Sequence, residues 1–116
     1  MPNSTELLAR LYDGFNARDV EAALATMHPD VIWANGLEGG HVHGHNGVRD
    51  YWTEQWATMD SRAEPTQISI GEDGTASVEV HLTARDLNGN ALFDEKASHV
   101  FQIVDGLIRR FDIRRS

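Results

Sequence analysis

The spacing of apolar residues changes along this chain, and that change constrains its fold most. Over residues 7–15 and 48–59 apolar side chains recur at intervals of three and four, which is typical of amphipathic helices. Over residues 75–85 they alternate with polar residues, which is typical of a strand with one buried face. Helices followed by a long antiparallel meander predict an α+β fold.

The first helix is expected to begin at Asn3 or Ser4, whose side chains can accept hydrogen bonds from the free backbone N–H groups of its first turn. It should end near residue 16. Asp19 is placed to cap a second short helix in the same way. The His-Pro-Asp sequence at 28–30 should end that second helix, because a residue before proline avoids the helical conformation.

A short strand is expected at 31–33, followed by a glycine-rich loop or extended ribbon at 36–46. A third helix should open at Asn46 or Gly47, and strands should resume at Pro65. The inner faces expected of the three helices consist of Leu7, Leu8, Leu11, Tyr12, Phe15, Val20, Ala23, Leu24, Met27, Val48, Tyr51, Trp52, Gln55, Trp56 and Met59.

The dipeptide Asn88-Gly89 predicts a two-residue hairpin turn. That turn would pair Val78 with His99 and Leu82 with Glu95, on a face that is otherwise apolar. A slip of one residue would exchange the two faces, so the pattern constrains the register. His99 and Glu95 are therefore expected to point inward.

Asp105-Gly106 predicts a second hairpin turn with two alternative registers. A plain two-residue turn sets His99 opposite Asp112. A turn with a glycine bulge sets His99 opposite Phe111 and gathers more apolar residues on one face, so we prefer it. It leaves Val100, Gln102, Ile108 and Arg110 on the outer sheet surface, which predicts a homodimer through the sheet.

Composition narrows the classes of function. The 116 residues predict a single domain, 1–116. The sequence has no run of the ~20 apolar residues that a membrane helix needs, and its N-terminus does not read as a signal peptide. A net charge of −8 argues against nucleic-acid binding. The absence of cysteine suits a reducing cytoplasm.

Three segments, LYDGFNARDVEAALATMHPDVIW (11–33), GVRDYW (47–52) and HVFQIVDGLIRRFDI (99–113), resemble the nuclear transport factor 2-like superfamily and its SnoaL-like and ketosteroid-isomerase-like group. The resemblance implies a cone: a strongly curved mixed β-sheet wrapped around N-terminal helices, as in a cystatin-like α+β roll. It implies a deep pocket between sheet and helices. Such members include steroid isomerases, polyketide cyclases, dehydratases and proteins without known activity, so the fold does not fix the reaction.

Isomerase-type members use a tyrosine, an aspartate base and a protonated aspartate. The matching positions here are Leu11, Asn35 and His99, and none carries the isomerase residue. His99 is the first candidate for a catalytic group, because an inward histidine can donate or accept a proton near neutral pH. Asn35 and Glu38 follow the first strand, where the resemblance implies a base, and are the other catalytic candidates.

The resemblance thus implies a protein that binds a small hydrophobic organic ligand in an apolar pocket. Isomerisation, cyclisation or dehydration is the proton-transfer chemistry it implies. The alternative is a non-catalytic binding or dimerisation module. The ligand-binding candidates are Tyr12, Trp33, Trp52, Trp56, Phe101 and Glu95, of which Trp52 and Trp56 could instead pack the third helix onto the sheet.

His41, His43 and His45 alternate along an extended segment, so their imidazoles could share one face and meet one ion. A carboxylate at useful spacing is lacking and glycines surround them. We therefore expect no physiological metal, and no cofactor is implied.

Overall fold

A computed structural model describes residues 4–36 and 38–114 of the chain. The elements follow in the order α1 (Ser4–Ala17), α2 (Val20–Leu24), β1 (Met27–Ala34), β2 (His41–His43), α3 (Gly44–Thr58), β3 (Met59–Ile70), β4 (Thr75–Asp86), β5 (Ala91–Val104) and β6 (Leu107–Arg114). Asn3, one of the two expected caps of the first helix, lies outside the described residues.

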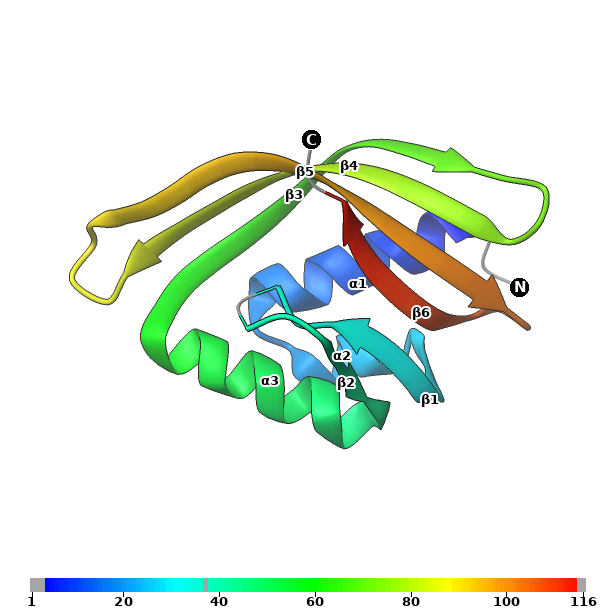
Figure 1. Cartoon of the computed structure of the whole chain (residues 1–116), viewed down its shortest axis with the longest axis horizontal. Helices are drawn as coiled ribbons and strands as arrows, with labels where there is room; N and C mark the ends of the chain where they lie inside the picture. Colours follow the sequence, from blue (N-terminus) through cyan, green and yellow to red (C-terminus); the bar gives the residue numbers. More distant parts are fainter. Residues whose placement is uncertain (1–3, 37, 115–116) are drawn as a thin grey trace.

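The strands form one six-stranded sheet in the order β2-β1-β6-β5-β4-β3. β1 and β6 pair in parallel, whereas the β3-β4-β5-β6 meander pairs antiparallel, so the sheet is mixed. The long strands bend over α1, and α3 runs below the open side of the bend (Figure 1). The predicted α+β fold with a curved sheet around N-terminal helices is confirmed.

The first helix buries the predicted apolar stripe and then turns sharply into α2. Arg18 adopts a left-handed conformation with φ of 62°, the Asp19 N–H donates to the Gly14 carbonyl at 2.8 Å, and the Arg18 N–H donates to the Phe15 carbonyl at 3.2 Å. This pair of bonds is a Schellman motif, which satisfies carbonyls at the helix end. The Asp19 side chain then accepts from the Ala22 N–H at 3.2 Å, so the predicted cap of the second helix is confirmed.

The expectation that residues 28–30 end the second helix was wrong. The helix ends at Leu24, and 28–30 lie within β1. Met27 pairs with Ile108 and Ile32 with Arg110, so β1 holds three more residues than β6 between these pairs. The extra residues bulge out of the ladder, which accommodates a proline that has no N–H to contribute.

The third helix and the following strand begin earlier than predicted. Gly44, in a left-handed conformation, opens α3, and β3 starts at Met59 rather than at Pro65. Pro65 lies instead at a register shift in an edge strand, where a missing N–H costs least. The ribbon expected at 36–46 is present in part, as β2.

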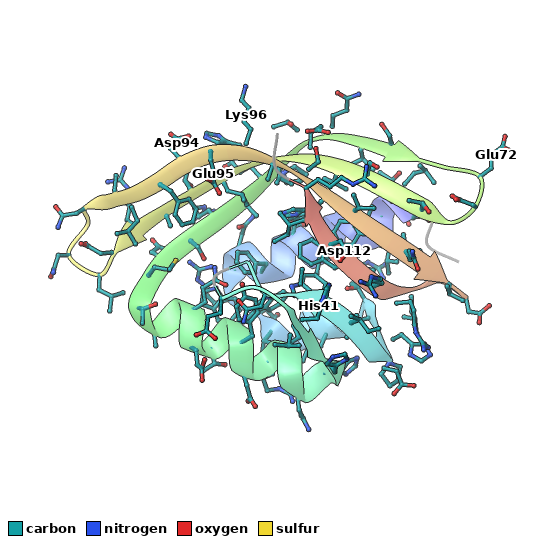
Figure 2. All side chains as sticks on the ribbon, in the orientation of Figure 1. His41, Glu72, Asp94, Glu95, Lys96 and Asp112 are labelled. Atoms are coloured by element: carbon teal, nitrogen blue, oxygen red, sulfur yellow. The ribbon has the colours of Figure 1, made fainter. Side chains whose placement is uncertain are left out.

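The predicted register of the first hairpin is confirmed, since Val78 pairs with His99 and Leu82 with Glu95. The flanking Asp94 and Lys96 lie on the outer side of β5 (Figure 2). One face of β4 and β5 therefore looks into the cone and the other into solvent.

The turn that joins these strands is longer than predicted. The Gly89 N–H donates to the Asp86 carbonyl at 3.0 Å, the Asp86 N–H donates to the Asn90 carbonyl at 2.8 Å, and Gly89 has φ of 90°. The turn thus contains one more residue than expected. A register shift directly after it leaves Leu92 without an opposite residue and restores the predicted pairing.

At the second hairpin the preferred register was wrong. Asp105 and Gly106 have φ of 54° and 79°, a plain two-residue turn whose twist matches that of the strands. A bulge follows at Arg109, because Ile103 pairs with Ile108 but Gln102 pairs with Arg110. His99 consequently lies opposite Ile113, neither of the two predicted partners.

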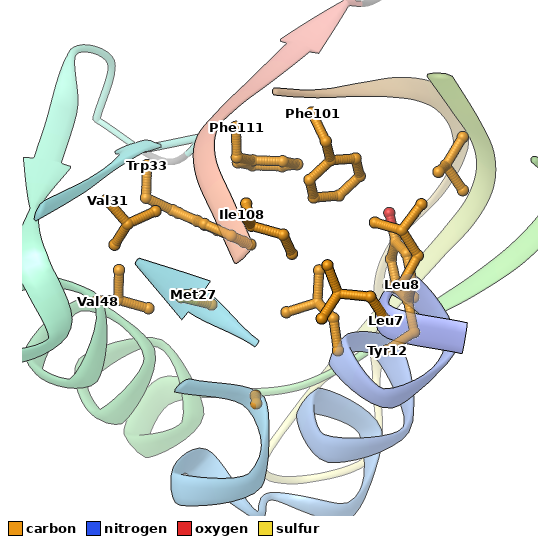
Figure 3. Close-up of a cluster of buried hydrophobic side chains, with 14 of the residues drawn as sticks. Leu7, Leu8, Tyr12, Met27, Val31, Trp33, Val48, Phe101, Ile108 and Phe111 are labelled. Carbon is orange, nitrogen blue, oxygen red and sulfur yellow. The ribbon is translucent and has the colours of Figure 1, made fainter. Parts of the chain in front are cut away.

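The same bulge corrects the predicted outer surface. Ile108 is fully buried, not exposed on the sheet, because the bulge turns both Ile108 and Phe111 toward the helices. Figure 3 shows these two side chains in the core with residues from α1 and α3. The largest fully buried side chains are Phe101, Leu8, Leu24, Met27, Ile108, Val31, Val48, Val78 and Val80.

A side-chain amide joins α1 to the edge strand β3. Asn16 donates from Nδ2 to the Ala63 carbonyl at 2.8 Å and accepts the Ala63 N–H on Oδ1 at 2.9 Å. This bonding holds β3 over the helix.

None of the helices within residues 4–36 and 38–114 has the length and apolarity that crossing a membrane requires.

Gly14 permits the close approach of α1 and α2. A Cβ at Gly14 would lie 3.0 Å from the Ala23 nitrogen and 3.1 Å from the Ala23 Cβ. Gly14→Ala should therefore lower the free energy of unfolding, since overpacking of about 1–3 kcal/mol exceeds the gain in helix propensity of up to about 1 kcal/mol.

Gly47→Ala in α3 is the matched control. Its Cβ would meet Val42 at an ordinary 3.4 Å, so only the gain in propensity should remain. Urea unfolding of both variants measures the difference, and equal stabilities would contradict the close-approach argument.

Candidate functional site

A cavity of about 290 Å³ lies between the concave face of the sheet, α1 and α3. Apolar and aromatic side chains make most of its wall. The lining residues are Leu11, Tyr12, Phe15, Trp33, Ala34, Gly36, Tyr51, Trp52, Gln55, Ser61, Arg62, Ala63, Leu82, Thr83, Phe93, Glu95, His99, Phe101, Phe111 and Ile113.

Tyr12 and His99 form a buried polar pair on this wall. The Tyr12 hydroxyl and His99 Nδ1 are 2.7 Å apart, and the two residues are only 4% and 6% exposed. The rings are nearly parallel, with centroids 5.9 Å apart. Phe111 approaches the His99 ring edge-on at 4.7 Å. The imidazole is therefore held in position by this hydrogen bond and by aromatic contacts.

Burial raises the pKa of Tyr12 well above its ordinary value, because the phenolate would be desolvated in the core. Tyr12 thus keeps its proton at neutral pH. A neutral imidazole has one donor and one acceptor nitrogen. When His99 Nδ1–H donates to the Tyr12 oxygen, Nε2 has no proton and can accept one; when the Tyr12 hydroxyl donates to Nδ1, Nε2 carries the proton and can donate it.

The aromatic walls come from elements far apart in the chain. Trp33 on β1 stacks on Phe111, with ring centroids 4.1 Å apart, and meets Trp52 of α3 edge-on, with centroids 5.5 Å apart. The ring centroids of Phe101 on β5 and Phe111 are 5.1 Å apart. Flat apolar surfaces held in this way suit an organic ring system.

The structure brings together many of the residues singled out in the sequence. Tyr12, Trp33, Trp52, Phe101, Glu95 and His99 all line the cavity. Trp56 is not among the lining residues. It packs behind them instead, 5.5 Å from Phe15, with the Arg18 guanidinium 5.1 Å from its ring.

Asn35 and Glu38 occupy a turn and are not among the cavity-lining residues. The Asn35 side-chain oxygen accepts from the Glu38 N–H at 2.9 Å, and the Asn35 N–H donates to the Gly40 carbonyl at 2.9 Å. Glu38 is exposed. The catalytic role expected of the two stays a prediction.

Two of the three alternating histidines contact different partners. His41 Nε2 lies 2.9 Å from an Asp112 carboxylate oxygen, and His45 Nε2 donates to the Met27 carbonyl at 3.0 Å. Within residues 4–36 and 38–114, no group of three histidine, cysteine or acidic side chains is arranged to hold a metal ion.

Comparison with known families decides where this cone belongs. The model of the SnoaL-like domain matches residues 8–111. The chain belongs to the SnoaL-like family. No curated protein matches it in sequence.

Solved structures share the SnoaL-like fold along almost the whole chain. TerC, co-crystallised with polyporic acid, is 26% identical, with a TM-score of 0.84 over 97% of this chain and 90% of its own. An NTF2-like protein of unknown function from Burkholderia pseudomallei is 24% identical, with a TM-score of 0.85 over 100% and 92%. A Mycobacterium tuberculosis protein in complex with estradiol-17β-hemisuccinate is 14% identical, with a TM-score of 0.82 over 95% and 91%.

Several polar residues of the SnoaL-like cavity were not singled out by sequence reasoning. Gln55 of α3 donates from Nε2 to the Ser61 hydroxyl at 3.0 Å, and Ser61 is buried on β3. Tyr51 accepts from the Gly36 N–H at 3.1 Å, which links the turn after β1 to α3. A polar residue on the apolar face of the third helix was the available signal for Gln55. Ser61 gave none, because β3 was expected to start later.

The raised pKa of Tyr12 makes the stability of this SnoaL-like domain fall in alkali. In the unfolded chain the hydroxyl ionises near pH 10.0, whereas the folded chain retains the proton. The Tyr12 contribution is therefore complete below about pH 10 and is lost as pH rises further, at up to about 1.4 kcal/mol per pH unit.

Tyr12→Phe removes this ionisation. Urea unfolding between pH 8 and 11 should give a flatter decline for the variant than for the wild type. Identical slopes would contradict a buried, protonated Tyr12.

Proposed function

We propose that this SnoaL-like domain binds a small, mostly apolar organic molecule in its cone and transfers a proton on that molecule through His99. The observation that carries the proposal is the Tyr12–His99 pair, 2.7 Å apart, on the wall of an aromatic cavity. A cavity of about 290 Å³ lies at the lower end of the usual range for ligand pockets, so the ligand is small.

Isomerisation, cyclisation and dehydration share one demand, the removal of a proton next to a carbonyl group and its return elsewhere. An imidazole can do both when its Nδ1–H donates to the Tyr12 oxygen, because Nε2 is then unprotonated and can take the proton from the ligand and return it. The Tyr12 hydroxyl holds the ring at Nδ1, and Phe111 contacts the ring in a T-shaped arrangement. Tyr12 is thus a positioning residue, and His99 is the group offered to the ligand.

The organic ligands of two similar structures support binding in the cone. Polyporic acid accompanies TerC, and estradiol-17β-hemisuccinate accompanies the mycobacterial protein. The isomerase positions Leu11 and Asn35 argue for a mechanism that differs from ketosteroid isomerisation. Leu11 has no proton to donate, and Asn35 has no carboxylate to serve as a base.

The test uses β,γ-unsaturated ketones, whose conversion to the conjugated isomer is followed by ultraviolet absorbance. Binding is followed by quenching of Trp33 and Trp52 fluorescence. His99→Ala should keep the fold, at a cost of about 1–3 kcal/mol for the cavity and the unpartnered Tyr12 hydroxyl, and should lose turnover. His81→Ala, which removes a histidine from the outer side of the sheet, is the matched control and should retain it.

Equal turnover in wild type and His99→Ala would overturn the catalytic part of the proposal. Glu38→Gln tests the role predicted for that carboxylate, which is exposed and outside the cavity lining. Loss of turnover would make Glu38 the base, whereas nearly unchanged turnover would leave proton transfer to His99. Ligand quenching without turnover of any ketone would favour the alternative, a non-catalytic binding module.

We also propose that the domain is a cytoplasmic homodimer that pairs through the outer sheet surface. The residues of that surface are half-buried Val100, exposed Gln102, and Arg110, which forms an ion pair with Asp112 at 2.7 Å. Ile108 is buried and does not belong to it. Light scattering at tens of micromolar protein should give twice the monomer mass of 12.9 kDa, and Val100→Asp should lower it. A wild-type monomer would overturn this state.

A further inference from the structure

Glu95 is the charged side chain that the sheet directs into the cavity. It lies on β5, pairs with Leu82 of β4 and lines the cavity wall. Its neighbours Asp94 and Lys96 lie on the outer side of β5 (Figure 2). Arg62 is the other charged lining residue. Its neighbours on β3, Ser61 and Ala63, are buried, so alternation along the strand turns the exposed Arg62 side chain outward.

Glu95 and His99 lie at opposite ends of the same wall. Along the inner face of β5, Phe93 and Glu95 are half-buried, whereas Ala97 and His99 are 4% and 6% exposed. Glu95 is therefore near the open end of the cone and His99 is deep within it. His99 follows Glu95 by four residues along the strand, which corresponds to about 13 Å.

We propose that Glu95 makes the cavity select ligands that carry an ammonium or similar cationic group at the end remote from His99. The inference rests on the proposed function, since it concerns the ligand of the same cavity. A carboxylate beside low-dielectric aromatic walls attracts a cation and repels an anion more strongly than in water. The rings of Tyr51, Trp52 and Phe93 that line the wall favour a cation further, through their electron-rich faces.

The charge of the whole chain acts in the same direction. A net charge of −8 raises the local concentration of cations and lowers that of anions around the protein. This long-range contribution is screened by salt, whereas contact with Glu95 at a partly buried site is screened much less. Salt therefore separates the two contributions.

Three probes with the same two-ring body test the inference: 4-phenylbenzylamine, 4-phenylbenzyl alcohol and 4-phenylbenzoate. Their dissociation constants are measured by tryptophan quenching at pH 7, in low salt and in 0.3 M NaCl. In 0.3 M NaCl the wild type should bind the amine roughly tenfold more tightly than the benzoate, with the alcohol between them, and the preference should be larger in low salt.

Glu95→Gln should weaken binding of the amine, strengthen binding of the benzoate and leave binding of the alcohol nearly unchanged, because the substitution removes the charge and keeps the shape of the side chain. Asp94→Asn removes the neighbouring carboxylate on the outer side of β5 and should preserve the order of the probes. Equal affinities of amine and benzoate for the wild type, or an equal effect of both substitutions, would overturn the role of Glu95. Binding of the alcohol tests the proposed function separately: failure of all three probes to bind would reject an apolar ligand site, and the inference with it.

Discussion

Burial of one apolar stripe on α1 is the contact on which the rest of this structure depends. Leu8, Leu11 and Tyr12 are at most 4% exposed beneath the curved sheet. Each buried apolar side chain contributes about 1.5–3 kcal/mol, so the stripe supplies much of the energy that bends the long strands over a helix. The bend in turn creates the concave face and its cavity. The same helix thus stabilises the cone and brings Tyr12 to its wall.

Sequence periodicity was sufficient for the architecture. Alternation along residues 75–85 determined which residues face inward, so His99 and Glu95 were expected inside before their neighbours were known. It was not sufficient for irregular pairing. The bulges at Leu92 and Arg109 each change the register by one residue, and their energies depend on the packing of a sheet that is not yet formed. Ile108 was placed on the wrong face for this reason.

The candidate site, like the fold, was predictable from the sequence only in part. The family resemblance and the inward face singled out His99, Tyr12 and Trp33, which the cavity brings together. The resemblance also singled out Asn35 and Glu38, but their turn is held by its own hydrogen bonds and carries them outside the lining. Gln55 and Ser61 form a contact between a helix and the strand that follows it. Such a contact depends on where α3 ends, and boundaries are what local sequence specifies least well.

The Asn16 amide has a consequence for how these molecules behave at high concentration. An edge strand offers unpaired backbone groups that can recruit a strand from another chain. On β3, Asn16 already occupies both backbone groups of Ala63, and Pro65 lacks an N–H next to a register shift. At the opposite edge, β2 is only three residues long. Both borders of the sheet are therefore poor templates for fibril growth, and crowded copies of this protein should resist strand-to-strand aggregation.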